Sequence, residues 1–316
     1  MLNRHKSKII LAIETSCDDT GIAVIKNGKV LSNVVLSTAK QHIKYGGIVP
    51  EIAARGHEQD LLPALMSAIN QAKIKLSDLT SIAYTAEPGL PGSLHIGKVF
   101  AKSLASLLKV PLIPVDHMMG HVFSFGINRP KVIKFPLLAL VVSGGHTSIY
   151  LFRSIKDYYV LNKTADDAVG ETLDKVGRML GLPYPGGVSI DKIYNSKSAT
   201  IKLIKHYPPE QSFSFSGIKT HMLNLINKFK AKGLLIDQKA LASSLLKWMI
   251  DEIVIKLNFY IRKCKVKTLV VGGGVSANKA LAMALSILPI KLLIPEKKYT
   301  GDNAAMIGMY AYLLDK

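Results

Sequence analysis

The chain has 316 residues, of which 48% are hydrophobic and 20% are charged, and its 41 Lys and Arg against 22 Asp and Glu give a net charge of +19. This length exceeds one ordinary core, so two domains are expected, and the apolar content excludes a disordered chain. The positive charge favours an anionic partner such as nucleic acid, although lysine spread over every surface explains it equally well.

Cysteine content and apolar runs bear on the compartment. Two cysteines, Cys17 and Cys264, exclude a disulfide framework and a multi-cysteine zinc site. The first residues, up to Glu14, hold too few apolar side chains for a signal peptide, and the apolar run from Phe135 to Val142 is too short to span a bilayer. A cytoplasmic protein that is not in a membrane is therefore expected.

The sequence predicts two similar halves, each opening with a strand, a polar turn and a returning strand. An Asn27-Gly28 hairpin turn leads into a further strand in the first half. The strands and turns of these openings are, in chain order, 8–14, 15–20 and 21–25 in the first half, and 135–142, 143–147, 148–152 and 157–161 in the second.

Helices and strands are expected to alternate after each opening. The expected helices are 57–72, 97–108, 166–180, 238–264, 277–288 and 303–314, and the expected strands are 81–85, 267–271 and 291–295. This pattern predicts α/β layers with partly parallel sheets. A duplicated unit of this kind is the plan of the actin-like (ASKHA, RNase H-like) superfamily. The expected domains are 1–115 plus 292–316 and 135–291, with a metal-binding segment at 116–134 between them.

The strongest local signal is the pair His117 and His121 in the segment His-Met-Met-Gly-His. This spacing places two imidazoles on one face of a helix, a common way to present two metal ligands, although packing explains many such pairs. Asp302 is the best candidate for a third ligand, because it lies at a turn before a predicted helix. Two histidines and one carboxylate leave coordination positions open, as in iron(II) sites, and are also compatible with zinc.

Polar and glycine-rich turns follow several predicted strands. Asp18 and Asp19, in the turn 14–20, could orient an amine, accept its proton or hold a cation. The glycines of 141–146 and 269–278 would let backbone N–H groups approach a nucleotide, although tight turns and strand–helix packing need the same residue type. The dinucleotide pattern G-x-G-x-x-G is not met, which argues against a Rossmann site.

Two further segments have open interpretations. The glycines of the predicted turn 184–191 could approach a nucleotide, with Asp191 accepting from a hydroxyl group. The segment 213–219 interleaves aromatic, hydroxyl and lysine side chains, which could contact RNA or belong to the core. Asp174 lies on a predicted helix, where a solvated face explains it equally well.

Eight motifs occur together in one order. They are Glu-Thr-Ser-Cys-Asp-Asp-Thr (14–20), Tyr-Gly-Gly-Ile-Val-Pro-Glu-Ile-Ala (45–53), His-Met-Met-Gly-His (117–121), Val-Ser-Gly-Gly-His-Thr (142–147), Tyr-Pro-Gly-Gly (184–187), Phe-Ser-Phe-Ser-Gly-Ile-Lys-Thr (213–220), Gly-Gly-Gly-Val-Ser-Ala-Asn (272–278) and Gly-Asp-Asn-Ala-Ala-Met-Ile (301–307). With these motifs the chain resembles the tRNA adenosine threonylcarbamoyltransferase family over nearly its whole length.

The resemblance implies two actin-like domains with the active site in the cleft between them. It implies transfer of a threonylcarbamoyl group from threonylcarbamoyl-adenylate to the exocyclic amine of the adenosine 3′ of the anticodon (position 37), in tRNAs that read ANN codons, with release of AMP. It also implies one divalent metal ion per subunit, held by His117, His121 and Asp302. Bacterial members work with an inactive paralogue and a small ATPase.

Other roles follow by position. The adenylate would be held by Val141, Val142, Ser143, Gly144, Gly145, Asp174, Gly187, Asp191 and Asn278. We assign Asp18 or Asp19 to positioning or deprotonating the amine. The sequence departs from the family at Glu87, where glycine is usual, and at Asp19, where many members have glutamate.

Three other functions agree less well with the sequence. An actin-fold small-molecule phosphotransferase fits the fold, but magnesium prefers oxygen ligands to a pair of histidines. A metalloprotease lacks the glutamate base beside the first histidine. A non-catalytic scaffold paralogue has no reason to keep His117, His121 and the Ser-Gly-Gly-His turn.

Overall fold

The structure is a computed structural model, and it describes residues 7–42, 45 and 47–315. Met1–Lys6 of the stretch considered for a signal peptide, and Gly46 of the 45–53 motif, lie outside the described residues. The chain divides into two compact units, residues 1–134 with 295–316 (unit 1) and residues 135–294 (unit 2). The 116–134 segment, expected between the domains, belongs to unit 1. Within the described ranges no helix is both long and apolar enough to cross a bilayer.

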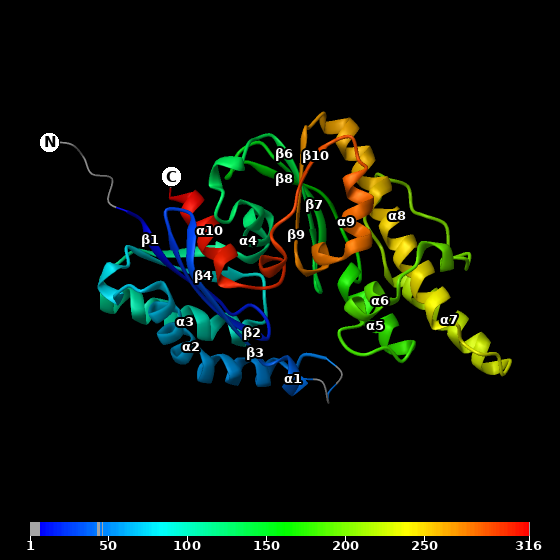
Figure 1. The fold of residues 1–316 in the computed structure, drawn as a ribbon, viewed down its shortest axis with the longest axis horizontal. Coiled ribbons are helices and arrows are strands. Elements are labelled where there is room, and N and C mark those ends of the chain that lie inside the picture. The colour runs from blue at the N-terminus through cyan, green and yellow to red at the C-terminus, as the bar shows by residue number, and fades with distance from the viewer. Residues whose placement is uncertain (1–6, 43–44, 46, 316) are drawn as a thin grey trace. The chain divides into compact units, whose positions relative to one another are not determined.

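Unit 1 contains a five-stranded mixed sheet in the order β3-β2-β1-β4-β5 (Figure 1). β1 pairs antiparallel with β2 and parallel with β4. The elements are β1 Ile9–Glu14, β2 Asp19–Lys26, β3 Lys29–Ser37, α1 Ala39–His42, α2 Pro50–Ala72, β4 Ser81–Glu87, α3 Pro91–Leu108, β5 Leu112–Asp116, α4 His117–Phe123 and α10 Ala304–Leu314.

The central strand β1 is apolar because both of its faces are covered. Leu11 and Ile13 belong to the core that packs against α2 and α3. On the other face α10 packs so closely on β1 that a Cβ at Gly308 would lie 3.0 Å from the Ala12 side chain. The prediction that the last helix returns to the first half is therefore confirmed, and unit 1 has three layers.

Unit 2 repeats the same sheet plan, in the order β10-β9-β6-β7-β8. Its core lies where α5, α7 and α8 cover one face of the sheet, with the apolar side chains of β6 facing them. The elements are β6 Leu137–Val142, β7 Thr147–Phe152, β8 Tyr158–Lys163, α5 Val169–Met179, α6 Gly186–Ile193, α7 Ser216–Ala231, α8 Gln238–Cys264, β9 Thr268–Gly272, α9 Lys279–Ser286 and β10 Lys291–Leu293.

Four of the named helices and strands were not predicted, and one segment was assigned wrongly. The strand β5, the short helix α1, the helix α4 as a bounded element and the helix α7 have no counterpart among the expected elements. The segment 184–191 was predicted as a turn, but the helix α6 begins within it, at Gly186. Its glycine is explained by packing, because Gly186 and Gly177 allow α6 and α5 to approach closely. The helix α8 begins and ends where the sequence predicted.

Candidate metal centre and nucleotide-binding turns

The short helix α4 presents the two histidines. The Asp116 side chain caps the helix by accepting a hydrogen bond from the Met119 N–H at 3.0 Å. His117 is therefore the first residue of α4, and His121 follows one turn later on the same face. Both side chains are buried, and their ring centroids lie 4.6 Å apart in an edge-to-face arrangement.

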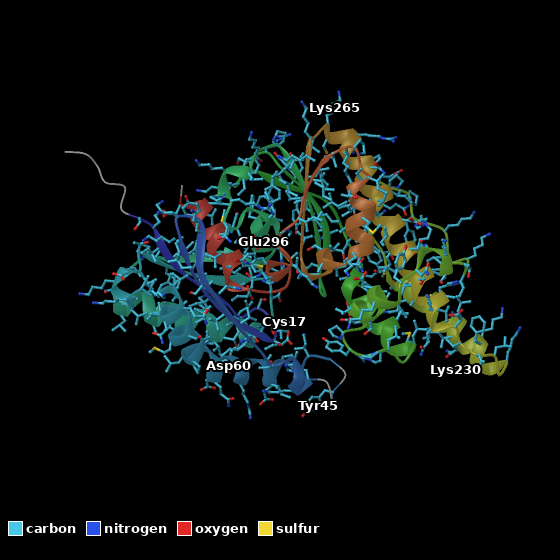
Figure 2. The ribbon with its side chains drawn as sticks, in the orientation of Figure 1. Cys17, Tyr45, Asp60, Lys230, Lys265 and Glu296 are labelled. Atoms are coloured by element: carbon cyan, nitrogen blue, oxygen red, sulfur yellow. The ribbon has the colours of Figure 1, made fainter. Side chains whose placement is uncertain are left out.

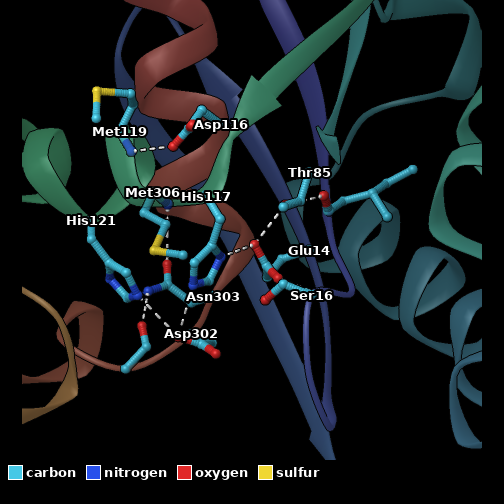
Figure 3. Close-up of polar contacts among 12 residues, drawn as sticks. Glu14, Ser16, Thr85, Asp116, His117, Met119, His121, Asp302, Asn303 and Met306 are labelled. Atoms are coloured by element: carbon cyan, nitrogen blue, oxygen red, sulfur yellow. Dashed lines mark hydrogen bonds and ion pairs between the residues drawn. The ribbon is translucent and has the colours of Figure 1, made fainter. Parts of the chain in front are cut away.

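Asp302 reaches this pair from a segment 181 residues further along the chain. The next residue, Asn303, caps α10 by accepting from the Met306 N–H at 3.2 Å, and α10 packs against α4. As Figure 3 shows, Asp302 consequently lies beside both imidazoles. Its Oδ1 lies 3.1 Å from Nε2 of His121 and 3.6 Å from Nε2 of His117.

The three side chains fit a first-row divalent metal ion. Their ligand atoms all lie within 4.8 Å of one another. Metal–ligand bonds of about 2.0–2.1 Å in tetrahedral geometry put neighbouring ligand atoms about 3.3 Å apart. The two distances to Asp302, 3.1 Å and 3.6 Å, lie on either side of that value, so Asp302 is placed to share an ion with either histidine.

Glu14 supports His117 from the side away from Asp302. The Nδ1–H of His117 donates to Oε2 of Glu14 at 3.0 Å, so Nε2 is the nitrogen that would bind an ion. The buried carboxylate also accepts from the Thr85 hydroxyl at 2.5 Å and from the Ser16 N–H at 2.6 Å. A carboxylate that orients a histidine ligand in this way makes the ligand more basic.

Charges around His117 decide its protonation. Burial lowers its pKa, but the negative charges of Glu14 and Asp302 outweigh burial and raise the pKa of His117 to about 9. Burial likewise acts to raise the pKa of Glu14, and the charge of His117 reverses that effect and lowers it. Without a metal the pair is therefore ionic, and an ion that binds at Nε2 displaces the proton.

His121 has no comparable support. Its Nε2 faces Asp302, while its Nδ1 is buried and has no hydrogen-bond partner in the part of the chain that the structure describes. His117 is therefore the better-oriented ligand of the two.

The turn that contains Asp18 and Asp19 is held rigidly. The Nε2–H of His57, a fully buried residue of α2, donates to the Cys17 carbonyl at 2.9 Å, and its Nδ1 accepts from the Thr20 hydroxyl at 2.7 Å. The Leu90 N–H donates to the Ser16 carbonyl at 2.7 Å. The turn is consequently fixed from both α2 and the loop before α3.

Within this turn Asp18 and Asp19 differ in their hydrogen bonds. Burial, reinforced by the charges of Asp18, Asp302 and Glu14, raises the pKa of Asp19 to about 6, although a hydrogen bond from Ser37 opposes the rise. Asp19 begins β2, and its Oδ1 is a buried oxygen without a hydrogen-bond partner among the described residues. Asp18 is half-buried, and its backbone carbonyl accepts from the Thr38 hydroxyl at 2.8 Å. Asp19 is therefore the better candidate for a base.

The Ser-Gly-Gly-His turn of unit 2 follows β6. The Ser143 N–H donates to the His146 carbonyl at 2.8 Å, while a Cβ at Gly144 or Gly145 would meet no atom within 4 Å. The first turn of α5 contacts this loop, since the Glu171 N–H donates to the Gly144 carbonyl at 3.1 Å. An exposed turn without side chains can bind phosphate through its backbone. The space around it is open, so packing does not require glycine at either position.

The β9 turn lies beside the β6 turn, because β6 and β9 are parallel neighbours. Gly273 has a φ of +90°, and a Cβ there would lie 2.3 Å from the Val142 carbonyl oxygen. Packing therefore explains this glycine, whereas Gly274 has open space around its Cβ position. Ligands of α/β sheets commonly bind beyond the carboxyl ends of the parallel strands, which is where both turns lie.

The remaining candidates in unit 2 make internal hydrogen bonds. Asn278 caps α9 by accepting from the Leu281 N–H at 2.8 Å, and Asp174 accepts from the Gly187 N–H at 2.9 Å. Burial raises the pKa of Asp174. Asp191 accepts from the Lys279 N–H at 3.4 Å and so joins α6 to α9.

Val141 and Val142 are fully buried strand residues. They pair with Ser148 and Thr147 of β7, and Val141 also pairs with Gly272 of β9. Their side chains are part of the buried core.

The sequence did not single out Glu14, Thr85 or His57. Glu14 lies in a recognised motif, but its contact with His117 joins residues 103 positions apart. Thr85 and His57 lie in a regular strand and a regular helix, and nothing in their local sequence marks them. Glu87, a departure from the family pattern, ends β4, where it pairs with Asp116 of β5.

Comparison with solved structures identifies the class of fold. The chain matches HypF from T. kodakarensis with a TM-score of 0.64 and 12% identity, covering 98% of this chain and 48% of that one. A full-length HypF in a phosphate- and nucleotide-bound form gives a TM-score of 0.61 and 11% identity, covering 98% and 55%. The protein therefore has the actin-like (ASKHA) fold, and the predicted α/β class is confirmed.

Sequence comparison identifies the family. The pattern of the tRNA N6-adenosine threonylcarbamoyltransferases matches residues 29–309. The enzyme of that name from Ureaplasma parvum is 47% identical over 308 residues, covering 98% of this chain and 96% of the relative. The one from Mycoplasma pneumoniae is 44% identical over 313 residues, covering 96% of each. The chain belongs to the tRNA N6-adenosine threonylcarbamoyltransferase family.

Proposed function

We propose that this protein transfers the threonylcarbamoyl group of threonylcarbamoyl-adenylate to the exocyclic amine of an adenosine in tRNA. The observation that carries the proposal is the convergence of His117, His121 and Asp302, in a chain of this family, with their ligand atoms all within 4.8 Å of one another. The alternatives are not favoured, because the curated relatives bear the transferase name.

The residues of unit 1 would hold one divalent ion. Two histidines and one carboxylate with open positions favour iron(II), and zinc is the second candidate. When bound, such an ion supplies a Lewis acid that polarises a carbonyl or phosphoryl oxygen. Glu14 keeps the Nδ1 proton of His117 in place, so that Nε2 carries the lone pair for the ion.

The other steps belong to the chain's own groups. An aromatic amine is a weak nucleophile, so a general base that removes its proton assists the attack. We assign this role to Asp19, whose buried carboxylate has a pKa raised to about 6 and is mostly ionised at neutral pH. The amine nitrogen bonds to the carbamoyl carbon, the bond from that carbon to the phosphate oxygen breaks, and AMP leaves with the electron pair. The backbone N–H groups of Gly144 and Gly145 would stabilise the phosphate charge.

We also propose the setting in which this reaction takes place. The anionic substrate agrees with the net charge of +19, and the two cysteines agree with a reducing cytoplasm. By family, the partners are an inactive paralogue and a small ATPase of the bacterial modification complex.

One assay tests the function. Purified protein is incubated with iron(II) or zinc, threonylcarbamoyl-adenylate and tRNA, with and without the bacterial partner proteins, and digested tRNA is analysed for the modified nucleoside by mass spectrometry. We expect product with the wild type and none with the metal-site variant His117→Ala. ATP-dependent phosphorylation of a small molecule, with no modified nucleoside in either arm, would favour the phosphotransferase. No reaction of either kind would favour the scaffold paralogue.

A further inference from the structure

A surface pocket lies on the outer side of α8, in unit 2, and has no part in the proposed chemistry. Its volume is about 520 Å³, within the roughly 300–1,000 Å³ of typical ligand pockets. The lining residues are Pro209, Ile255, Asn258, Phe259, Arg262 and Lys263. Five of the six have the spacing of residues on one face of a helix, so this face of α8 forms one side of the pocket and Pro209 forms the other.

The wall of the pocket is fixed by a buried charge. Lys256 is fully buried on the core side of α8, and its Nζ donates to the carbonyls of Pro208 at 3.0 Å and Gln211 at 2.9 Å. The same Nζ lies 3.1 Å from a carboxylate oxygen of Glu252, which is also fully buried. The loop that carries Pro209 is therefore held against α8 from inside, and the pocket is formed in advance of any ligand.

The chemistry of the pocket is aromatic and cationic. The Lys263 ammonium lies 5.4 Å from the centroid of the Phe259 ring, and both Arg262 and Lys263 are exposed. None of the six lining residues is acidic. An apolar floor with positive charge at its rim fits a nucleotide, whose base stacks on the ring while its phosphates meet the cations.

The charge of the whole unit favours RNA over other ligands. Residues 135–294 carry 22 Lys and Arg against 10 Asp and Glu, which is +12 of the chain's +19. Lys265 and Lys267 continue the positive charge past the end of α8, and Figure 2 shows nitrogen-tipped side chains extending from this end, where Lys265 is labelled. An acidic protein surface would match the charge but would not need the aromatic floor.

The pocket lies at the other end of the unit 2 sheet from the glycine turns. α8 ends at Cys264, just before β9 begins at Thr268, whereas the Gly272–Gly274 turn follows the carboxyl end of β9. A ligand in the pocket is therefore not the adenylate proposed for those turns.

We infer that this pocket binds a single-stranded nucleotide of the substrate tRNA, as a contact separate from the reacting adenosine. The inference rests on the proposed function. Arg262 and Lys263 bind phosphates, and Phe259 stacks a base.

The test measures binding of full-length, unmodified tRNA to the intact protein over a range of salt concentrations. The double variant Arg262→Glu/Lys263→Glu is expected to bind about tenfold more weakly or worse, with the slope of log K against log salt reduced by ~1.5. Phe259→Leu, which keeps the apolar volume but removes the stacking surface, is expected to weaken binding about fivefold or more. Thermal melting checks that each variant is folded.

The matched control is Lys228→Glu/Lys230→Glu, the same change of charge on two exposed residues of α7. If it weakens binding as much as the α8 pair does, affinity depends on general charge and the pocket proposal is wrong. The pocket proposal is equally wrong if the α8 variants bind tRNA normally, and pocket-dependent binding of polyglutamate would then identify an acidic protein as the ligand.

The two proposals can fail separately. Wild-type protein that binds tRNA through the pocket but forms no modified nucleoside would overturn the proposed function alone. Variants that bind and modify tRNA like the wild type would overturn the pocket alone.

Discussion

Glu14 and His117 are joined by a buried hydrogen bond of 3.0 Å between Oε2 and Nδ1, although 103 residues separate them in the chain. Glu14 ends β1 and His117 begins α4, so the contact fixes the first proposed metal ligand to the central strand of unit 1. The orientation of this ligand therefore depends on the sheet, and it does not depend on the short helix alone.

Glu14→Gln tests this contact. The amide keeps the shape of the side chain but loses the charge that supports the imidazole, so affinity for the metal is expected to fall about 10–100-fold. Competition titration with a chromophoric chelator measures the change. Glu87→Gln is the control, since Glu87 is exposed, and it should leave the affinity unchanged. Equal affinity for Glu14→Gln and wild type would contradict the supporting role.

The titration of Asp19 predicts a pH dependence of activity. Its pKa is raised to about 6, so the ionised form that would act as a base is lost as the pH falls through that value. We expect the rate of transfer by the wild type to fall below pH 6, which gives its pH–rate profile an acidic limb. Asp19→Asn should lose most activity, and its remaining activity should lack this acidic limb. Asp18→Asn should keep the acidic limb of the profile. If Asp19→Asn also keeps it, another group is responsible for the loss of rate at low pH.

The same shift makes a prediction about stability. A carboxyl group whose pKa is higher in the folded than in the unfolded state favours folding when protonated, and this contribution is lost as the pH rises from about 4 to about 6. Asp19→Asn, which is never charged, should therefore gain in melting temperature over the wild type at pH 8 more than at pH 4. Melting curves of the metal-free proteins at both pH values measure the difference, and an equal shift at both would argue against the raised pKa.

Gly273 and Gly274 form a matched pair for a folding test. Alanine at Gly273 would adopt a φ of +90° and overlap the Val142 carbonyl, so the free energy of unfolding should fall by more than the ~1–3 kcal/mol of backbone strain alone. Alanine at Gly274 meets open space. Urea unfolding should thus show a large loss for Gly273→Ala and a small one for Gly274→Ala.

Two lysines of α8 each pair with a carboxylate one helical turn away on the same helix: Lys247 with Asp251, and Lys256 with Glu252. The Lys256 pair is fully buried, so Lys256→Met would remove the lysine partner of Glu252 and leave its carboxylate with His206 and the Tyr207 N–H, at a cost of about 3–5 kcal/mol. Lys247→Met breaks an exposed pair and should cost less than about 1 kcal/mol. Chemical denaturation of the two variants compares them directly, and similar losses would contradict the proposed anchor of the pocket wall.

The sequence predicted the strands of both sheets where apolar runs are buried on two faces, as in β1 and β6. It missed β5, because Pro114 and the flanking polar residues interrupt the apolar pattern of an edge strand. The segment of α6 was predicted as a turn because two glycines open it, although those glycines permit close packing on α5.

The residues of the candidate metal site also differ in how far the sequence predicts them. The spacing of His117 and His121 predicts two neighbouring imidazoles, because four residues make about one helical turn. The nearness of Asp302 depends on how α10 packs against α4, and that of Glu14 depends on where β1 ends. Such tertiary contacts produce no periodic pattern in a single sequence. Asp302 was predicted only because it lies in a turn before a helix, and Glu14 was not predicted.

The packing of α10 has a consequence for the order of events during synthesis. Residues 295–315 complete unit 1, yet the ribosome makes them only after all of unit 2. Unit 2 can close its core while β1 still has one face uncovered. The chain cannot offer all three proposed ligands to an ion until Asp302 emerges, so the proposed metal site is completed only after unit 2 has been made.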